Sequence, residues 1–122
     1  MTDSAAIIED AFRTALDARG ADVIYYRDGH SMPLRAVPTR YAPSGEDVGR
    51  VAVSTDDQDY LLLSADLSIG GEKFEPKRGD QLDDGGRVFE VWRGDQDREF
   101  RYADHDRVVL RVHTKFKEEY SG

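Results

Sequence analysis

The 122-residue sequence contains no cysteine, and this absence excludes several kinds of chemistry. Disulfides, thiolate-bound zinc, iron–sulfur clusters and a cysteine nucleophile all need the thiol that the chain lacks. Long apolar runs are also missing, because the longest, at residues 60–63, falls far below the roughly 18 residues that span a bilayer. No apolar segment follows the acidic start at Asp3, so we expect neither a membrane span nor an export signal.

Positive charge is scarce relative to negative charge. Seventeen Lys and Arg stand against 25 Asp and Glu, which gives a net charge of -8 at pH 7. A charge of this sign opposes binding to nucleic acid or anionic lipid by bulk electrostatics. The length fits a single domain over residues 1–122, since folding units usually contain about 100–200 residues. Composition therefore predicts a soluble acidic domain without indicating its function.

The first 20 residues have the pattern of one amphipathic helix. Apolar residues form a single stripe on a 3.6-residue period, and they are Ile7, Ile8, Ala11, Phe12, Ala15 and Leu16. Asp3 or Ser4 can cap the start, and Gly20 ends the pattern. We expect the helix to cover residues 5–19 and to pack its stripe on the sheet of the same chain. The alternative is docking on a neighbouring subunit, for which Ile8 and Phe12 are the candidate contacts.

After Gly20 the apolar period changes to two, which is typical of strands. Residues 23–26 lead into Asp28-Gly29, a dipeptide that suits a tight hairpin turn, and residues 32–37 form the returning strand. Pro33 and Pro38 have no amide donor. The returning strand should therefore lie at a sheet edge or have one unpaired side.

Further strand patterns follow at close spacing. They cover residues 51–53, 60–63, 81–82, 87–92 and 107–116, with a short helical turn at residues 64–67. The segment containing Arg78-Gly79-Asp80 is predicted to be a turn between strands. Six or seven short strands after one helix predict a mainly β fold. We expect a small antiparallel β-barrel or sandwich over residues 21–118, with the N-terminal helix of residues 1–20 packed on it.

One long segment, residues 40–50, has no strand or helix period. It contains Tyr41, Pro43, Gly45, Glu46 and Asp47, together with a second glycine at position 49. This composition predicts a long mobile loop, and loops of that kind are often functional.

Catalytic and metal-binding patterns are missing from the sequence. Asp104-His105-Asp106 has no second histidine nearby, and Asp56, Asp57 and Asp59 lack the spacing of a calcium loop. No serine lies in a nucleophile-elbow motif, and the glycine pairs do not form a phosphate-binding loop. We therefore expect no enzyme activity, no catalytic residue, no metal site and no cofactor.

The last predicted strand alternates apolar residues with a mostly basic face formed by Arg111, His113 and Lys115. This face is the one hint of nucleic-acid binding, and the net charge opposes it. Pairing with acidic residues of adjacent strands is the favoured interpretation. The same three residues are candidates for subunit or partner contacts.

Several short motifs occur in an order that resembles small head-to-tail joining proteins of tailed phages and prophages, the head completion or stopper proteins of the lambda type. They are residues 23–29 (VIYYRDG), Asp66-Leu67 with Gly70-Gly71, residues 75–80 (EPKRGD), residues 88–91 (VFEV) and residues 111–115 (RVHTK). Phe89 replaces the tyrosine that is commoner in this group. Together the motifs cover residues 20–116.

The resemblance implies a helix-plus-barrel virion protein without catalysis. Several copies, commonly six, would form a ring in the phage neck between the portal or adaptor and the tail terminator or tail tube. The protein would be made in the host cytoplasm and located in the neck of the virion. The loop at residues 40–50 would project into the channel and hold back packaged DNA, without sequence-specific or membrane binding. Two alternatives stay open: a tail terminator or other neck ring component, and a cellular β-barrel binding module.

Overall fold

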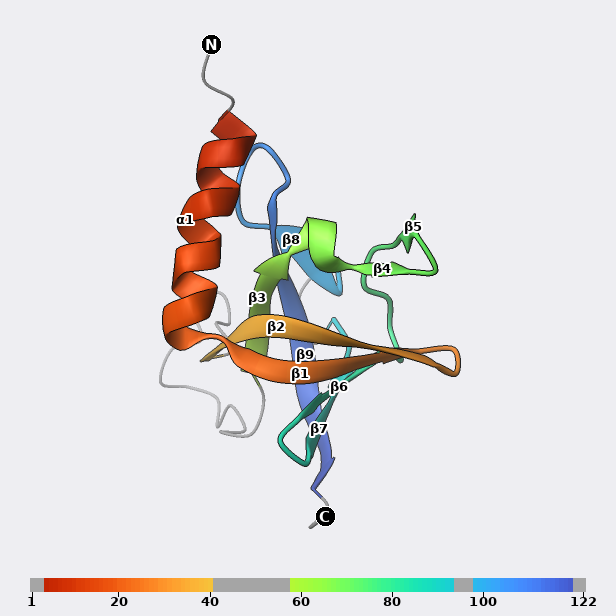
Figure 1. Cartoon of the computed structure of the whole chain (residues 1–122). Coiled ribbons are helices and arrows are strands. Elements are labelled where there is room, and N and C mark those ends of the chain that lie inside the picture. The colour runs from red at the N-terminus through yellow and green to blue at the C-terminus, as the bar shows by residue number, and fades with distance from the viewer. Residues whose placement is uncertain (1–3, 41–57, 94–97, 120–122) are drawn as a thin grey trace.

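The computed structural model describes residues 4–40, 58–93 and 98–119, in which an α-helix precedes a β-sheet (Figure 1). The helix, α1, covers Ser4–Arg19 and confirms the predicted amphipathic segment, with a start one residue earlier. The strands are β1 (Ala21–Arg27), β2 (His30–Arg40), β3 (Gln58–Leu63), β4 (Ser68–Ile69), β5 (Glu72–Lys73), β6 (Gln81–Asp84), β7 (Arg87–Val91), β8 (Phe100–Tyr102) and β9 (Val109–Glu119). A 3₁₀ turn, η2, covers Ser64–Asp66 and confirms the predicted helical turn.

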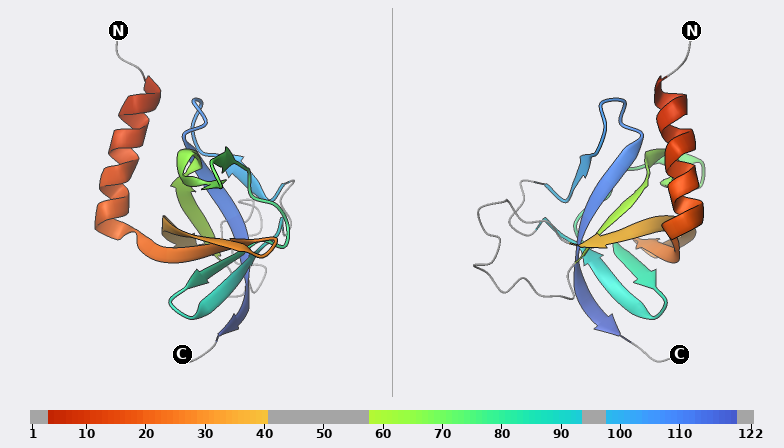
Figure 2. Two further views of the ribbon diagram at one scale, coloured as in Figure 1. Left: turned by 45° about the vertical axis from the view of Figure 1, so that its right-hand side comes forward. Right: turned by 90° about the vertical axis from the view of Figure 1, so that its left-hand side faces the viewer.

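The strands of the described residues close into an antiparallel barrel. The order is β3-β2-β1-β6-β7-β9, and β3 also pairs with β9, which joins the two ends of the sheet. Strand β8 adds to β9 outside this cycle, and β4 and β5 form a separate hairpin. Figure 2 shows α1 standing beside the barrel. The prediction of a mainly β fold with one N-terminal helix is confirmed, and of its two forms the structure is the barrel.

Strand β2 passes from one partner to another along its length. Residues Ala36 and before pair with β1, and Val37 to Arg40 pair with β3. Pro33 is opposite Ile24 of β1, where β3 does not pair, and Pro38 is opposite Tyr60 of β3, where β1 does not pair. Each proline thus has a strand on one side only, as its missing amide requires. This confirms the predicted unpaired side.

Two tight turns connect β1 to β2 and β6 to β7. Asp28 and Gly29 have φ angles of 48° and 81°, and Gly85 and Gly86 have 64° and 98°, all in the left-handed region that two-residue hairpin turns need. The strand before the second turn is longer than the predicted residues 81–82, because Asp83 and Asp84 also belong to β6. The predicted strand at residues 51–53 lies outside the described residues, and sequence reasoning missed β8 and the β4–β5 hairpin.

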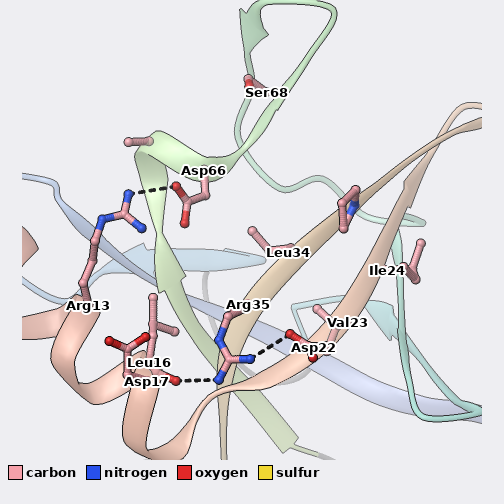
Figure 3. Close-up of a pocket in the computed structure, with 12 residues that line it drawn as sticks. Arg13, Leu16, Asp17, Asp22, Val23, Ile24, Leu34, Arg35, Asp66 and Ser68 are labelled. Carbon is pink, nitrogen blue, oxygen red and sulfur yellow. Dashed lines mark hydrogen bonds and ion pairs between the residues drawn. The ribbon is translucent and has the colours of Figure 1, made fainter.

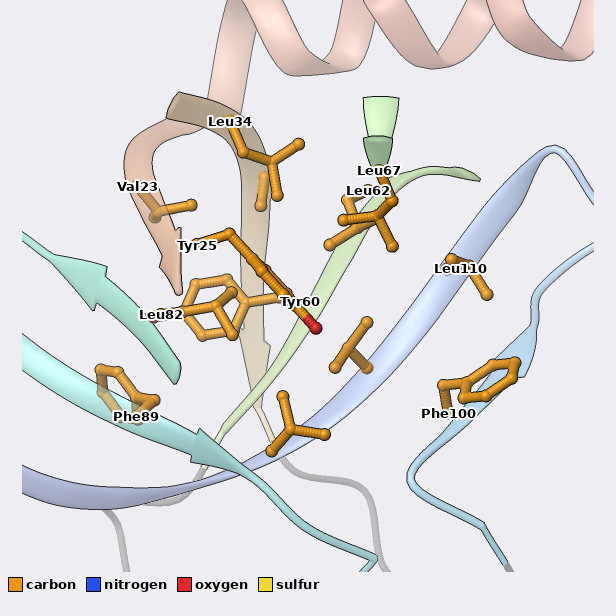
Figure 4. Close-up of a cluster of buried hydrophobic side chains, with 13 residues drawn as sticks. Val23, Tyr25, Leu34, Tyr60, Leu62, Leu67, Leu82, Phe89, Phe100 and Leu110 are labelled. Atoms are coloured by element: carbon orange, nitrogen blue, oxygen red, sulfur yellow. The ribbon is translucent and has the colours of Figure 1, made fainter. Parts of the chain in front are cut away.

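The barrel interior is filled by side chains from all six strands (Figure 4). Fully buried members include Tyr25, Tyr60, Leu62, Leu82 and Phe89. A second, smaller cluster lies under α1, where Leu16, Leu63 and Val109 are buried. The two clusters are separate, so the barrel has a core of its own beside the helix contact.

A buried carboxylate fixes the segment that leads into β6. Asp80 is 3% exposed and accepts hydrogen bonds from the Tyr25 hydroxyl at 2.6 Å and from the Lys77 amide at 3.0 Å. The Arg27 guanidinium is 3.1 Å from the same carboxylate and also donates to the Glu75 carbonyl. The predicted turn at Arg78-Gly79-Asp80 is confirmed. The carboxylate of Asp80 is buried and accepts hydrogen bonds from within the protein.

Replacing Tyr25 by Phe should lower the free energy of unfolding by about 1–3 kcal/mol at neutral pH, because Asp80 loses a buried donor. The variant should also depend less on pH. Burial, and then the bond to Asp80, raise the pKa of Tyr25, so the folded protein keeps this proton where the unfolded chain, with a pKa of about 10, releases it. The wild-type protein therefore loses stability as the pH rises above about 10.

Denaturant unfolding at about pH 8 and at about pH 10.5 measures the stability that each variant loses as the pH rises. The two pH values lie below and above the pKa of about 10 of a free tyrosine. Tyr26→Phe is the matched control, because Tyr26 is the next residue of β1 and is 41% exposed. Equal alkaline losses in the two variants would contradict the assignment to Tyr25.

Candidate assembly surfaces

The predicted gating residues Tyr41, Pro43, Gly45, Glu46 and Asp47 lie outside the described residues. The points where this segment leaves and rejoins the barrel are described. Strand β2 ends at Arg40 and β3 begins at Gln58, and these two residues are paired across the sheet. Residues 41–57 therefore start and finish side by side at one place on the barrel.

Helix α1 contacts the outside of the barrel through a narrow part of its apolar stripe. Leu16 is buried, and the other contacting side chains of the helix are partly buried. We call the surface that receives them the α1 docking site; it consists of Val37, Leu61, Leu63, Val108 and Val109. Ile8 and Phe12 pack there, as predicted for the stripe.

Ile7 does not follow this prediction, because its side chain is 54% exposed. The stripe is wider than the surface that receives it. Ile7 and Ile8 are separated by about 100° around the helix axis, so a narrow contact buries one and leaves the other at its edge. The exposed isoleucine is an apolar position at the edge of the α1 contact that its own barrel covers only in part.

Polar contacts hold both ends of α1. The Ser4 hydroxyl donates to Asp106 at 2.6 Å, and Arg13 donates to Asp66 at 3.2 Å. Near the other end, Arg35 of β2 donates to the Leu16 and Gly20 carbonyls and also pairs with Asp22. A cationic side chain at the C-terminal carbonyls is favourable because these groups have no partner within the helix.

A groove of about 640 Å³ lies between α1, the β1–β2 hairpin and η2 (Figure 3). Leu16, Val23 and Leu34 contribute apolar lining. Most of the charged side chains that line it are paired with each other, in the Arg13–Asp66 and Arg35–Asp22 ion pairs (Figure 3). The groove holds no arrangement of nucleophile and base. Sequence reasoning missed it because the groove depends on the angle between α1 and the hairpin that follows it, and on the position of η2, which local periodicity does not give.

The basic side chains on this face of β9 pair with acidic side chains of neighbouring strands, first of all with a buried acid of β3. Asp59 is 0% exposed and accepts a 2.6 Å hydrogen bond from Arg111 Nε. His113 Nδ1 lies 3.1 Å from the other oxygen of the same carboxylate, and His113 is only 3% exposed. The favoured interpretation, pairing with acidic residues of adjacent strands, is confirmed.

Lys115 also pairs with an acidic residue of an adjacent strand, and both of these side chains are partly exposed. Its ammonium lies 3.6 Å from Glu90 of β7 and 4.8 Å from the ring centroid of Trp92. Lys117 approaches the same glutamate at 3.9 Å. The role of Arg111, His113 and Lys115 in subunit contacts stays a prediction, and among the three Lys115 and Arg111 are the more accessible.

The Asp104-His105-Asp106 segment is a turn that is organised by its own backbone. Asp104 accepts hydrogen bonds from the amides of Asp106, Val108 and Val109, while His105 is exposed. Within residues 4–40, 58–93 and 98–119, no group of three or more potential metal-ligating side chains comes together. In that same part of the chain, no helix is long and apolar enough to cross a membrane.

Comparison with known proteins adds one decisive finding. A family model described as phage head-tail joining protein matches residues 1–121. The chain belongs to this family. Membership confirms the resemblance seen in the ordered motifs and identifies a component of the virion that is associated with joining head to tail. Searches of curated proteins and of solved structures each gave no match.

Family membership changes how the surface features of this head-tail joining protein are interpreted. It favours the phage hypothesis over the cellular binding module and directs attention to contacts between proteins, since the family is a structural one.

Removing the charge of Asp59 should destabilise the barrel where β3 and β9 close it. Asp59→Asn leaves Arg111 and His113 without their buried carboxylate, which should cost about 3 kcal/mol. Glu90→Gln is the control, because its pairs with Lys115 and Lys117 are half-exposed and should be worth about 1 kcal/mol or less. Chemical denaturation of both variants measures the difference. Equal losses would contradict a structural role for the Asp59 pairings.

Proposed function

We propose that this protein is a stopper of the phage neck, present as a ring of about six copies, by the resemblance stated above. The ring closes the portal channel after DNA packaging and offers the surface to which the tail attaches. Its partners are the portal or adaptor protein on one side and the tail terminator or tail tube protein on the other. The observation that carries the proposal is the family match over residues 1–121.

The barrel geometry supports a ring in which the channel lies between copies. Side chains fill the interior of each barrel, so DNA has no path through a single subunit (Figure 4). The β3–β9 pairing joins the two ends of the six-stranded cycle, while β8 and the β4–β5 hairpin lie outside it. Subunits can then meet through side chains of the cycle and through the elements outside it, such as α1.

The charge of the chain suits a protein that surrounds DNA without gripping it. Each copy has a net charge of -8, and several copies around one axis add their potentials. Like charge disfavours adhesion of phosphate to the channel wall, so packaged DNA can pass. In this role the protein is a single domain of residues 1–122 that performs no catalysis.

Deleting the gene in the encoding phage tests the proposal. We expect DNA-filled heads that lose DNA and carry no tails, with restoration by a wild-type copy supplied in trans. Electron microscopy and measurement of nuclease-sensitive DNA in purified heads provide the readout. Stable filled heads beside tails of irregular length would instead identify a tail terminator, the second candidate. Normal infectious particles would contradict both.

The gating role is proposed for residues 40–50, including Tyr41, Pro43, Gly45, Glu46 and Asp47. Replacing most of this segment by a short turn should preserve the fold, because Arg40 and Gln58 are already paired and closing a shorter loop changes the free energy little. We expect particles that package DNA and then leak it, or that fail to join tails. Infectious, DNA-retaining particles would show that the gate lies elsewhere.

A further inference from the structure

The groove between α1, the β1–β2 hairpin and η2 has a volume of about 640 Å³ and an apolar floor (Figure 3). Leu16 lines it from the helix, and Ile24 and Pro33, which are paired across the hairpin, line it from the sheet. Their strand neighbours Val23 and Leu34 are buried, so alternation places Ile24 and Pro33 on the outer face of the barrel. Clefts of about 300–1,000 Å³ can bury most of a small ligand.

One wall of this groove is a strand edge. Strand β2 pairs with β1 up to Ala36 and with β3 only from Val37 onward. The groove is lined by Pro33 to Arg35, where β2 has a partner strand on one edge only within the described residues. An unpaired edge offers backbone hydrogen-bonding groups to a segment of another chain. The groove is therefore suited to a peptide segment.

The groove also carries one negative charge that its own chain leaves unpaired. Arg13 pairs with Asp66, and Arg35 pairs with Asp22. Asp17 of α1 lines the same groove, is exposed, and forms no ion pair within the part of the chain that the structure describes (Figure 3). A segment that enters the groove should therefore carry a positive charge.

The β4–β5 hairpin of the same chain is a projecting element. Its strands have two residues each and form a sheet separate from the barrel. Gly70 and Gly71 form its turn, and a Cβ at either position would meet no described atom within 4 Å, so the tip is narrow and uncrowded. Figure 1 shows this hairpin and α1 at opposite flanks of the molecule. A two-stranded hairpin is marginally stable by itself, so a further contact would stabilise it.

Lys73 gives this hairpin a positive charge without a partner. It is exposed and forms no ion pair with any described residue, whereas Lys77 lies 3.6 Å from Asp28. Its neighbour Glu72 points to the other side of the strand, because successive side chains alternate. The hairpin thus carries an unpaired cation, and the groove on the opposite flank carries an unpaired anion.

We infer that the β4–β5 hairpin of one subunit docks in the groove of the next subunit, with Lys73 opposite the neighbour's Asp17. This inference rests on the proposed ring. Hairpin and groove are two different surfaces of one chain, so the contact is head-to-tail, and its repetition around an axis closes a ring in which every groove is occupied. Helix α1 stays on its own docking site, and the barrel is unchanged.

Reversal of the two charges tests the contact. Asp17→Lys, Lys73→Asp and the double variant are supplied in trans to phage that lack the gene. Both residues are exposed, so each variant should keep the denaturation midpoint of the wild type. Each single variant places like charges at every contact and should lower the number of tailed particles by about tenfold or more. The double variant should restore that number. Normal tailing with either single variant, or no recovery with the double variant, would overturn the inference.

A mixture of the two single variants shows whether the contact joins different copies. In a ring with an even number of copies, such as the proposed six, the two variants can alternate, and every Lys73 or its replacement then faces an opposite charge. Supplied together, the two variants should restore tails that neither restores alone. A contact within one chain would gain nothing from mixing, so failure of the mixture would overturn the inference.

Asp10→Lys combined with Lys73→Asp is the matched control. Asp10 is exposed on the same face of α1, two turns before Asp17, and it does not line the groove. This control has the same net charge as the double variant and should not restore tails. Equal recovery would mean that only total charge matters, and it would overturn the docking. Failure of the wild-type protein to restore tails would instead contradict the neck ring itself.

Discussion

The pairing of β3 with β9 is the constraint on which the rest of the structure depends. The other strands pair in the order β3-β2-β1-β6-β7-β9, and the β3–β9 pairing joins the two ends of this order. The sheet thereby becomes a closed barrel. The buried carboxylate of Asp59 lies on this seam and binds side chains of β9. Because β3 is the strand that follows residues 41–57, the closure also determines where that segment rejoins the barrel. Leu61 and Leu63 of the α1 docking site also belong to β3.

The sequence predicted the parts of the fold that local chemistry determines. The period of the apolar stripe gave α1, Asp28-Gly29 gave the first hairpin turn, and Pro33 with Pro38 indicated a strand with an unpaired side. The three-residue strand β8 and the β4–β5 hairpin were missed because segments so short have no detectable period. Sequence alone also left barrel and sandwich equal, since the choice depends on one long-range pairing.

Surface features were predicted less well than the fold, for a reason that applies to other β proteins. Alternation along β9 correctly separated inward from outward residues, yet outward did not mean exposed. His113 lies on the outer face, yet it is buried and its ring contacts Asp59 of the neighbouring strand. Ile7 shows the opposite error, since an apolar stripe was wider than its contact. Both errors concern contacts between side chains of different elements. Such contacts depend on how the elements are placed against each other, which composition does not determine.

The pairing of Arg40 with Gln58 has a consequence for how such proteins diversify. A connection whose two ends are held together by the sheet can be lengthened, shortened or rewritten without a change in the strands that anchor it. Selection on the barrel and selection on the connection are then largely independent. One scaffold can then carry connections of different length and sequence at this position, in the way that antibody frameworks tolerate variable loops. The barrel of this protein is, in this sense, a stable platform for a segment that is free to evolve.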